Sequence, residues 1–364
     1  MKLFLRLSQE HYTLPPAEVK AVIEAENIKA NVKLVAQGLI TIDINPEMDF
    51  EEVYQILIKR LGYTHEISHL IKESTINELE KDFLSINWEN YIDTNFAIRL
   101  KRINDTGCKY QEISLENAYQ GNMDYKTAEA QAIERRLGHL TLEKYSNIKV
   151  KLNNPQTYIH ILIESDNAYI GIKKFKMDKK YFQKMKAHKR PFFYPGSMDP
   201  KLARCMVNLT RVKEGDTVLD PFCGTGGILI EAGKVGAKVL GSDIDKKMVF
   251  GTQKNLRFAG INEFDIEHAD ARTIVLDEKV NAVVTDPPYG ISSSTLGNSS
   301  GEVFKQFLTS ICNLLADDGL LCMASPHYLN IEPFLNESGL ELQEKYEIRM
   351  HKSLTRVISL IHKK

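Results

Sequence analysis

The sequence predicts an α/β protein whose C-terminal half is a doubly wound, mostly parallel sheet and whose N-terminal half is an α+β region. From residue 214 onward, short apolar strands alternate with helices, as in parallel sheets covered by helices on both faces. Two strands then follow each other near the end with no helix between them, which indicates an antiparallel hairpin at the sheet edge. Residues 1–73 instead follow the order strand, helix, strand, strand, helix, strand, which is that of a ferredoxin-like domain.

Each element of the C-terminal half follows from its apolar pattern. The expected strands are residues 217–221, 238–244, 265–268, 282–286 and 320–324. The expected helices are residues 227–235, 246–259, 303–315 and 331–338. The expected hairpin pairs residues 340–350 with residues 356–361.

The N-terminal half divides into two expected segments. Residues 1–73 should hold a helix from Pro15, a second helix over 50–61, and strands at 2–8, 32–36, 39–44 and 64–71. Residues 74–172 should hold helices at 76–86 and 125–137 and strands at 96–103, 157–164 and 168–173. The last two strands flank Ser165–Asn167, a typical hairpin turn. No nucleophile or metal-ligand spacing occurs here, which favours a binding module.

The composition is that of a folded protein without a membrane span. The chain of 364 residues is long enough for two or three domains, and it has no run of about 18 apolar residues. The five cysteines are scattered and lack CxxC spacing, which argues against a disulfide framework or a metal site and fits a reducing compartment. We therefore expect a cytoplasmic protein that holds no metal.

A basic segment, residues 173–190, lies between the two halves. It carries nine Lys or Arg residues and one acidic residue, although the whole chain has a net charge of −1. Such a block can hold nucleic-acid phosphates, and the aromatic residues interleaved between Phe175 and Tyr194 favour that function. A solvated linker is the alternative. The expected phosphate contacts are Lys184, Lys186, Lys189 and Arg190.

A glycine-rich turn follows the first strand of the C-terminal half. The strand ends in Asp220-Pro221-Phe222-Cys223-Gly224-Thr225-Gly226-Gly227, and a helix begins at once. Glycines let the backbone pass close to a ligand while helix N–H groups point toward it. A carboxylate in front of the turn would repel a pyrophosphate but suits a ligand with a positive amino group, such as S-adenosylmethionine. Because packing alone also favours glycine in such turns, other residues must support this interpretation.

Two further acidic residues follow the next strands. Asp243 ends the second strand, where a carboxylate can accept hydrogen bonds from ribose hydroxyls. Asp270 follows the third strand and could accept from an adenine amino group or simply cap its loop. Asp245 is expected to cap the helix that begins at Lys246. Ligands bind at the carboxyl edge of such sheets, so acidic residues at three successive strand ends indicate a ligand site.

The fourth strand runs into Asp286-Pro287-Pro288-Tyr289-Gly290. The prolines remove N–H donors, which leaves the Asp286 carboxylate and the Pro287 carbonyl as acceptors. Two acceptors can hold both hydrogens of an exocyclic amino group and turn its lone pair toward a methyl donor. Asp286 can also take the released proton, and Tyr289 offers a flat face to an unstacked base. A proline-rich turn without function is the alternative, but the ordered acid, aromatic and glycine favour catalysis.

Together, these motifs resemble the site of the class I amino-group methyltransferases of nucleic acids, in the branch with NPPY or DPPY motifs. Residues 190–198 and 349–356 resemble segments of the archaeal tRNA (guanine-10-N2)-methyltransferase family, which joins a THUMP domain to a Rossmann-like catalytic domain. The resemblance covers essentially the whole chain. It is strong in the C-terminal half and rests on element order in residues 1–172.

The resemblance implies a domain plan and a reaction. The plan is a ferredoxin-like domain over 1–73, a THUMP RNA-binding domain over 74–172, a basic linker over 173–190 and a methyltransferase domain over 191–364. The reaction is transfer of methyl from S-adenosylmethionine to N2 of guanosine 10 in tRNA, which archaeal members can continue to N2,N2-dimethylguanosine. A monomer would act without an activator subunit.

The family's site residues carry over by motif position. The implied catalytic residues are Asp286 and Tyr289, which act beside the Pro287 carbonyl expected above as the second acceptor. The implied cofactor contacts are Asp220, Gly224, Asp243 and Asp270, and we expect Phe222 and Gly226 of the same turn to contact the cofactor as well. The terminal hairpin is expected to hold phosphates of the target loop through His351, Lys352 and Arg356; surface residues of the hairpin without an RNA contact are the alternative.

Three alternatives remain open. A related THUMP methyltransferase could act on guanosine 6 of tRNA or on a ribosomal RNA guanine, although the segment 351–356 favours position 10. An adenine-N6 DNA methyltransferase would not need the THUMP-like half. A non-catalytic RNA-binding protein would not need every acid and glycine of the site.

Overall fold

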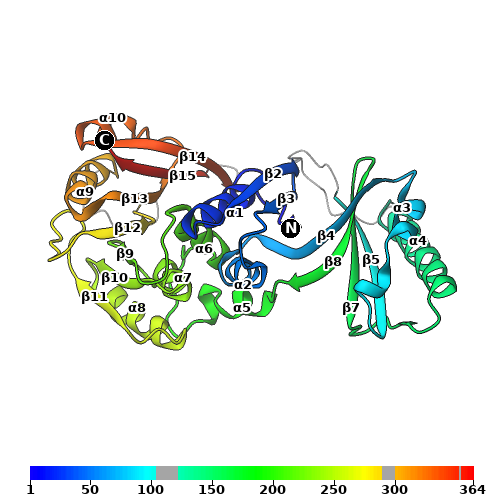
Figure 1. Cartoon of the computed structure of the whole chain (residues 1–364). Helices are drawn as coiled ribbons and strands as arrows, with labels where there is room; N and C mark the ends of the chain where they lie inside the picture. Colours follow the sequence, from blue (N-terminus) through cyan, green and yellow to red (C-terminus); the bar gives the residue numbers. More distant parts are fainter. Residues whose placement is uncertain (104–121, 289–299, 352–353) are drawn as a thin grey trace. The chain divides into compact units, whose positions relative to one another are not determined.

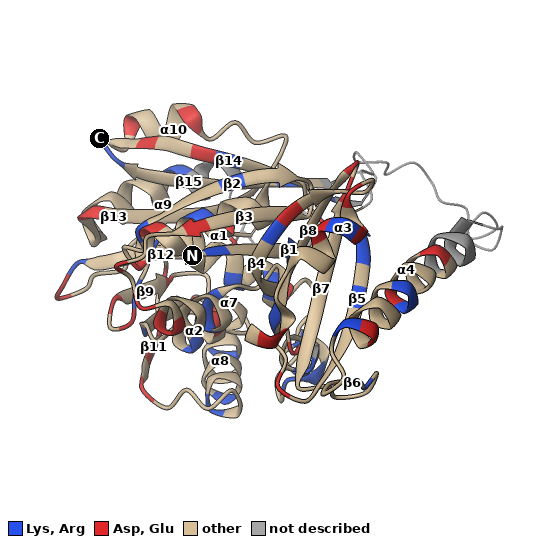
Figure 2. Cartoon of the chain, turned by 45° about the vertical axis from the view of Figure 1, so that its right-hand side comes forward, with Lys and Arg blue, Asp and Glu red and all other residues tan. Residues whose placement is uncertain are grey.

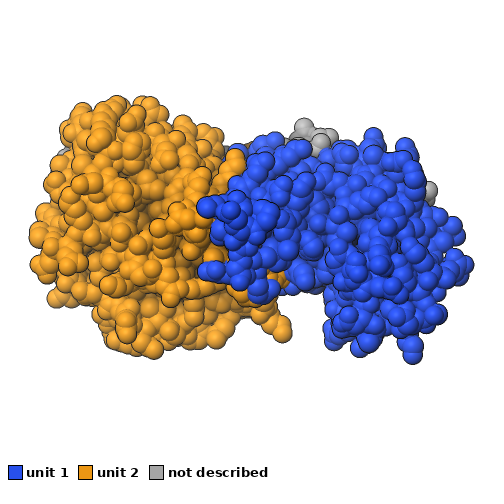
Figure 3. All heavy atoms as spheres, in the orientation of Figure 1, with its two compact units in different colours: residues 1–16, 29–52, 64–177 blue, residues 17–28, 53–63, 178–364 orange. Residues whose placement is uncertain are grey.

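The structure, a computed structural model, describes residues 1–103, 122–288, 300–351 and 354–364 (Figure 1). At residues 122–127, 300–304, 350, 351 and 354, and at Lys179, only the backbone is described. The chain forms two compact units (Figure 3): unit 1 has residues 1–16, 29–52 and 64–177, and unit 2 has residues 17–28, 53–63 and 178–364. No helix in the described part is long and apolar enough to cross a membrane.

Unit 1 is built on one eight-stranded sheet with the order β2-β3-β1-β4-β8-β7-β5-β6. The pairs among its first four strands are antiparallel, and their order β4-β1-β3-β2 is ferredoxin-like, as predicted for residues 1–73. β7 and β8 pair antiparallel across the predicted hairpin turn. The strands are β1 (Lys2–Leu7), β2 (Ala30–Ala36), β3 (Leu39–Ile44), β4 (Thr64–Thr75), β5 (Asn95–Ile103), β6 (Lys149–Val150), β7 (Thr157–Glu164) and β8 (Asn167–Lys176).

The strand β4 connects the two segments that sequence analysis separates at residue 73. It extends to Thr75 rather than residue 71, and its residues 73–75 pair with residues 167–169 of β8. The polar sequence after residue 71 gives no local sign of a strand, because its pairing partner lies far along the chain. β8 likewise continues to Lys176, so the expected linker begins as part of this strand. The independence of the two segments as domains stays a prediction.

The core beside β5, β7 and β8 is built around Trp88, which is 1% exposed. Its ring lies 4.6 Å from the Phe83 ring, and its Nε1–H donates to the Phe83 carbonyl at 3.0 Å. Phe83 lies on α3 (Leu79–Ser85), and α4 (Asn122–Lys144) contributes Leu137 to the same core. α4 is longer than the predicted helix over 125–137, and it carries both acidic and basic residues (Figure 2).

Unit 2 contains a seven-stranded sheet with the order β11-β10-β9-β12-β13-β15-β14. β11, β10, β9, β12 and β13 are parallel to one another, whereas β15 is antiparallel to both β13 and β14. The predicted parallel sheet with a C-terminal antiparallel hairpin at its edge is therefore confirmed. The strands are β9 (Thr217–Asp220), β10 (Lys238–Asp243), β11 (Phe264–His268), β12 (Val280–Thr285), β13 (Leu315–Pro326), β14 (Leu340–His351) and β15 (Leu354–Lys363).

Helices connect these strands largely where the sequence predicts them. Asp245 caps α8 by accepting from the Lys247 N–H at 2.8 Å, as predicted. The strand β13 is much longer than the predicted residues 320–324. The connecting helices are α7 (Gly227–Val235), α8 (Lys246–Phe258), α9 (Ser300–Leu314) and α10 (Glu332–Glu337).

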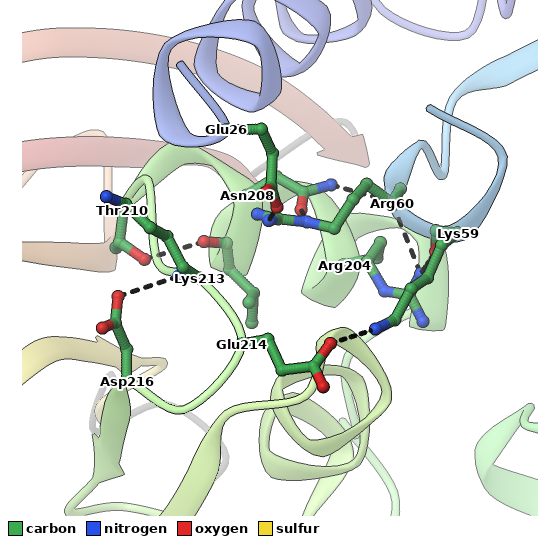
Figure 4. Close-up of polar contacts among 10 residues, drawn as sticks. Glu26, Lys59, Arg60, Arg204, Asn208, Thr210, Lys213, Glu214 and Asp216 are labelled. Carbon is green, nitrogen blue, oxygen red and sulfur yellow. Dashed lines mark hydrogen bonds and ion pairs between the residues drawn. The ribbon is translucent and has the colours of Figure 1, made fainter. Parts of the chain in front are cut away.

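One buried helix of unit 2, α6 (Pro200–Leu209), was not predicted. Its side chains donate to carbonyls at the end of α2 (Phe50–Arg60), which a helix end leaves unpaired (Figure 4). Arg204 donates to the Lys59 carbonyl at 2.9 Å, and Asn208 donates to the Arg60 carbonyl at 3.0 Å. Asn208 also donates to Glu18 of α1 (Leu14–Ala25) at 2.9 Å. These bonds join residues 17–28 and 53–63 to residues 178–364 within unit 2.

Gly171 of β8 lies so close to β4 that no side chain fits there. A Cβ at this position would lie 2.0 Å from the His69 carbonyl oxygen. We expect Gly171→Ala to lower the free energy of unfolding of unit 1 by about 1–3 kcal/mol. The measurement is the thermal-unfolding midpoint, which should fall. The matched control is Gly138→Ala in α4, where the nearest atom is 3.8 Å away and alanine favours the helix. A midpoint unchanged by Gly171→Ala would contradict this packing.

Candidate active site

Four acidic residues lie in order along one edge of the unit 2 sheet. β11, β10, β9 and β12 are parallel neighbours, so their carboxyl ends meet at the same edge. Asp220 and Asp243 end β9 and β10, while Asp270 follows β11 and Asp286 follows β12. The structure thus brings the predicted cofactor acids and the predicted catalytic acid together. In the described part of the chain, no group of three or more His, Cys, Asp or Glu side chains could hold a metal ion.

The turn between β9 and α7 requires glycine at two positions. Gly224 and Gly226 have positive φ angles of 52° and 76°, which residues with a Cβ rarely adopt. A Cβ on Gly226 would also lie 2.9 Å from the Thr252 side chain. The Gly226 N–H donates to the Cys223 carbonyl at 2.7 Å, and the Gly224 N–H donates to the Asp243 carboxylate at 2.9 Å. The turn therefore has a fixed shape and is tied to the end of β10.

The segment before α6 supports this turn. Asn255 of α8 accepts from the Phe192 N–H at 3.0 Å and donates to the carbonyls of Phe192 at 2.8 Å and Thr225 at 2.9 Å. Arg190 is 5% exposed and donates to the Thr225 carbonyl at 3.3 Å. The sequence-based prediction that Arg190 binds RNA phosphate does not fit this burial. Its role in the turn was missed because Thr225 lies far from it in sequence.

Asp220 joins the cofactor side of the edge to the acceptor side. Its carboxylate is 1% exposed and accepts from the Thr285 hydroxyl at 2.7 Å and from the Phe222 N–H at 3.2 Å. Burial raises the pKa of this carboxyl to about 7, although both hydrogen bonds lower it, and the charges of Asp243 and Asp286 raise it further. Since Thr285 directly precedes Asp286, this bond fixes the end of β12 relative to the glycine turn.

The other predicted cofactor residues are less buried. Asp243 accepts from a backbone N–H two residues further on at 3.0 Å, and burial raises the pKa of its carboxyl. Hydrogen bonding to Arg272 lowers the pKa of Asp270, whose carboxylate accepts from the guanidinium Nε at 2.9 Å. The Phe222 ring packs against Phe307 with 5.2 Å between ring centroids. Contact of these residues with a cofactor stays a prediction.

On the acceptor side, Asp286 is paired with an arginine of the C-terminal hairpin. The Arg356 Nη2 lies 3.1 Å from the Asp286 Oδ2, and Arg356 is 8% exposed. The prediction that Arg356 holds RNA phosphate does not fit this burial beside a carboxylate, and the structure corrects it to a partner of Asp286. Pro287 is buried next to Asp286. Tyr289, predicted to stack on the base, lies outside the described residues.

The remaining predicted RNA contacts occupy different positions. Lys184 and Lys189 are exposed, whereas Lys186 is half-buried. Lys184, at the end of α5 (Lys179–Lys184), has its ammonium 5.2 Å from the centroid of the Phe258 ring. For His351 only the backbone is described, at the end of β14. Lys352 lies outside the described residues. RNA binding by these residues stays a prediction.

Unit 1 has a polar hollow that the sequence did not predict. Its volume is about 470 Å³, and its lining includes His69, Tyr91, Lys173 and Lys174. Lys173 also lies 3.8 Å from the buried carboxylate of Glu66, whereas Lys174 is exposed. The lining also includes Asp93, so the hollow combines two cations with a carboxylate and an aromatic ring.

The strand order, the glycine turn and the ordered acids define unit 2 as a class I methyltransferase. Residues 187–358 match the family described as RMKL-like, methyltransferase domain, and residues 28–254 match that described as DNA methylase. The second match ends before Asp286 and does not include the acceptor motif. A solved structure, TrmN from Thermus thermophilus, shares the fold with a TM-score of 0.57 and 18% identity, covering 100% of each chain.

Relatives in two archaea match along the full length. A tRNA (guanine(10)-N2)-dimethyltransferase of Methanothermobacter thermautotrophicus is 43% identical over 363 residues, covering 100% of both chains. A protein of the same name in Methanocaldococcus jannaschii is 33% identical, covering 98% of each chain. This chain therefore belongs to the tRNA (guanine(10)-N2)-dimethyltransferase family. The family membership expected from the motifs is confirmed.

The buried Asp220 should make stability depend on pH. The pKa of its carboxyl is about 7 in the folded chain and about 4 in an unfolded one, so its contribution to stability is fully present below about pH 4 and is lost as the pH rises through about 7. Asp220→Asn keeps an acceptor for Thr285 but cannot titrate. From about pH 5 to about pH 8, we expect its free energy of unfolding, measured with urea, to rise relative to the wild type by up to about 3 kcal/mol. A difference that does not change with pH would contradict the assigned pKa.

Proposed function

We propose that this chain transfers methyl groups from S-adenosylmethionine to N2 of guanosine 10 in tRNA, giving N2-methylguanosine and then N2,N2-dimethylguanosine. The observation that carries the proposal is the position of Asp286 and Pro287, which follow β12 beside the glycine turn of β9. The names of the full-length relatives support the substrate, the position and the second methyl group.

The cofactor edge fits the chemistry of the methyl donor. S-adenosylmethionine supplies a methyl group on a positively charged sulfur. Gly224 and Gly226 have no side chains that would keep a ligand from the backbone of the turn. The half-buried Asp243 can accept from ribose hydroxyls. Asp220 provides negative charge for the donor's amino group, and that positive charge would in turn favour the ionised carboxylate. We propose that the residues in contact with the cofactor are Asp220, Phe222, Gly224, Gly226, Asp243 and Asp270.

The acceptor edge fits an exocyclic amino group. The Asp286 carboxylate and the Pro287 carbonyl can each accept one N2 hydrogen, which directs the nitrogen lone pair toward the donor. As the new N–C bond forms and the S–C bond breaks, N2 loses a proton. Asp286 takes this proton, since a protonated aryl amine is a much stronger acid than a carboxylic acid. The work of the site is positioning and removal of water rather than strong base catalysis.

We infer that the rest of the chain binds the tRNA. Residues 1–73 and 74–172 would act as ferredoxin-like and THUMP domains, with the unit 1 hollow around Lys174 and Tyr91 available to RNA. Lys184, Lys186 and Lys189 would hold phosphate. The chain would act in the cytoplasm as a monomer, without an activator subunit. The free cysteines of the described residues fit a reducing compartment.

Adenine-N6 methylation of DNA is the second candidate, because residues 28–254 match a DNA methylase family. Methylation of guanosine 6 in tRNA, or of a ribosomal RNA guanine, would use the same site. Radioactive methyl transfer to tRNA, ribosomal RNA and duplex DNA, followed by nucleoside analysis and by mapping of the labelled nucleotide in the tRNA, separates these candidates. Label in N2-methylated guanosine at position 10 supports the proposal, and label in N6-methyladenosine would refute it.

Asp286→Ala removes one of the two acceptors of the amino group. We expect the methylation rate to fall at least about 100-fold while tRNA binding, measured by gel shift, stays within about 2-fold. The matched control is Asp277→Ala, an exposed aspartate before the amino end of β12, at the opposite edge of the sheet. Full activity of Asp286→Ala would contradict the assigned role.

A further inference from the structure

The contact between Arg356 and Asp286 crosses the sheet. Asp286 follows β12, and Arg356 lies on β15, with β13 between the two strands. Arg356 is paired with Pro326, the last residue of β13, so its long side chain reaches the carboxyl edge where Asp286 lies. The side chains of Arg356 and Asp286 are only 9% and 19% exposed. An ion pair this sheltered is weakly screened by water and salt.

A guanidinium at this distance determines what Asp286 can do. The positive charge favours the ionised carboxylate, and the hydrogen bond fixes its orientation. An ionised carboxylate can only accept hydrogen bonds, and it has about four acceptor positions. The bond from Arg356 uses one of them on Oδ2. A base that this carboxylate binds must therefore present donors to it.

Guanine and adenine both carry an amino group, but their Watson–Crick edges differ in donors and acceptors. Guanine presents adjacent donors, N1–H and the N2 amino group, whereas adenine presents its N6 amino group beside N1, which is an acceptor. An ionised carboxylate matches both guanine donors, but one of its oxygens would face the N1 lone pair of adenine. A neutral amide in the same place could donate to that N1. Charge on residue 286 thus separates guanine from adenine.

We propose that Arg356 is a positioning residue that selects guanine, because it holds Asp286 as an ionised acceptor for both N1–H and N2–H of the target base. Pro287 then accepts the second N2 hydrogen. The inference rests on the proposed function and adds the contact to N1. The site recognises the base through a carboxylate whose ionised form is stabilised by an arginine of the C-terminal hairpin.

The test compares guanine with 2-aminopurine at position 10 of a tRNA transcript. Both bases carry the 2-amino group, but N1 of 2-aminopurine accepts and cannot donate. Both transcripts carry uridine opposite position 10, which pairs with either base. Single-turnover methylation rates and kcat/KM are measured for the wild type, Arg356→Gln and Arg356→Lys. The intrinsic reactivities of the two amines cancel when the preference ratio of a variant is divided by that of the wild type.

We expect Arg356→Gln to lose about 100-fold in kcat on guanine and to lower the preference for guanine over 2-aminopurine at least about 10-fold. Arg356→Lys keeps the positive charge, and it should recover part of the kcat on guanine and part of the preference for guanine. The matched control, Lys345→Gln, removes an exposed cation from β14 of the same hairpin and should leave both quantities unchanged. A merely structural arginine would lower both rates equally and leave the ratio unchanged.

Two results would overturn the inference: an unchanged preference ratio in Arg356→Gln, or equal kcat/KM of the wild type on both bases. If Arg356→Gln does not fold, as judged by its thermal-unfolding midpoint, the ratio for Arg356→Lys decides in its place. Failure of the proposed function would look different, since the wild type would then place no methyl group on guanosine 10. The two failures are therefore distinguishable in one set of reactions.

Discussion

The site depends on one buried hydrogen bond, from the Thr285 hydroxyl to the Asp220 carboxylate at 2.7 Å. Parallel pairing brings the ends of β9 and β12 to the same edge, but it does not fix the loops that follow. The bond fixes them, because Asp220 opens the glycine turn and Thr285 directly precedes Asp286. A donor bound at the turn and a base held by Asp286 would therefore face each other at a set distance, which is what methyl transfer requires.

The same arrangement concentrates negative charge at the edge, and the chain compensates only part of it. Arg272 pairs with Asp270 and Arg356 pairs with Asp286. Asp220 and Asp243 have their pKa raised by burial. In the proposed complex the methyl donor is positively charged, so its binding would reduce the repulsion and burial energy of these carboxylates. The electrostatic design favours a cationic ligand on the β9 and β10 side and a neutral, hydrogen-donating base on the β12 side.

Sequence alone predicted the parts of the fold that depend on local pattern. The parallel strands of unit 2, the cap at Asp245 and the gathering of Asp220, Asp243, Asp270 and Asp286 follow from apolar runs and from the rule that strand ends share an edge. Prediction from the sequence failed where a contact joins segments that lie far apart along the chain. The pairing of β4 with β8, the burial of Arg190 and Arg356, and the helix α6 all depend on partners remote in sequence. A basic residue in a motif was taken for an RNA contact, because sequence does not show which charges are buried.

A structure of the chain bound to S-adenosylhomocysteine and tRNA would test the central claim most directly. The measured quantities are the distances from the Asp286 carboxylate oxygens to N1 and N2 of guanosine 10. The account predicts that both lie within about 3.2 Å, with the Arg356 guanidinium still on Asp286 and the Thr285 hydroxyl still on Asp220. A guanine whose N2 faces a different residue, or an Arg356 that has left Asp286 for an RNA phosphate, would contradict it.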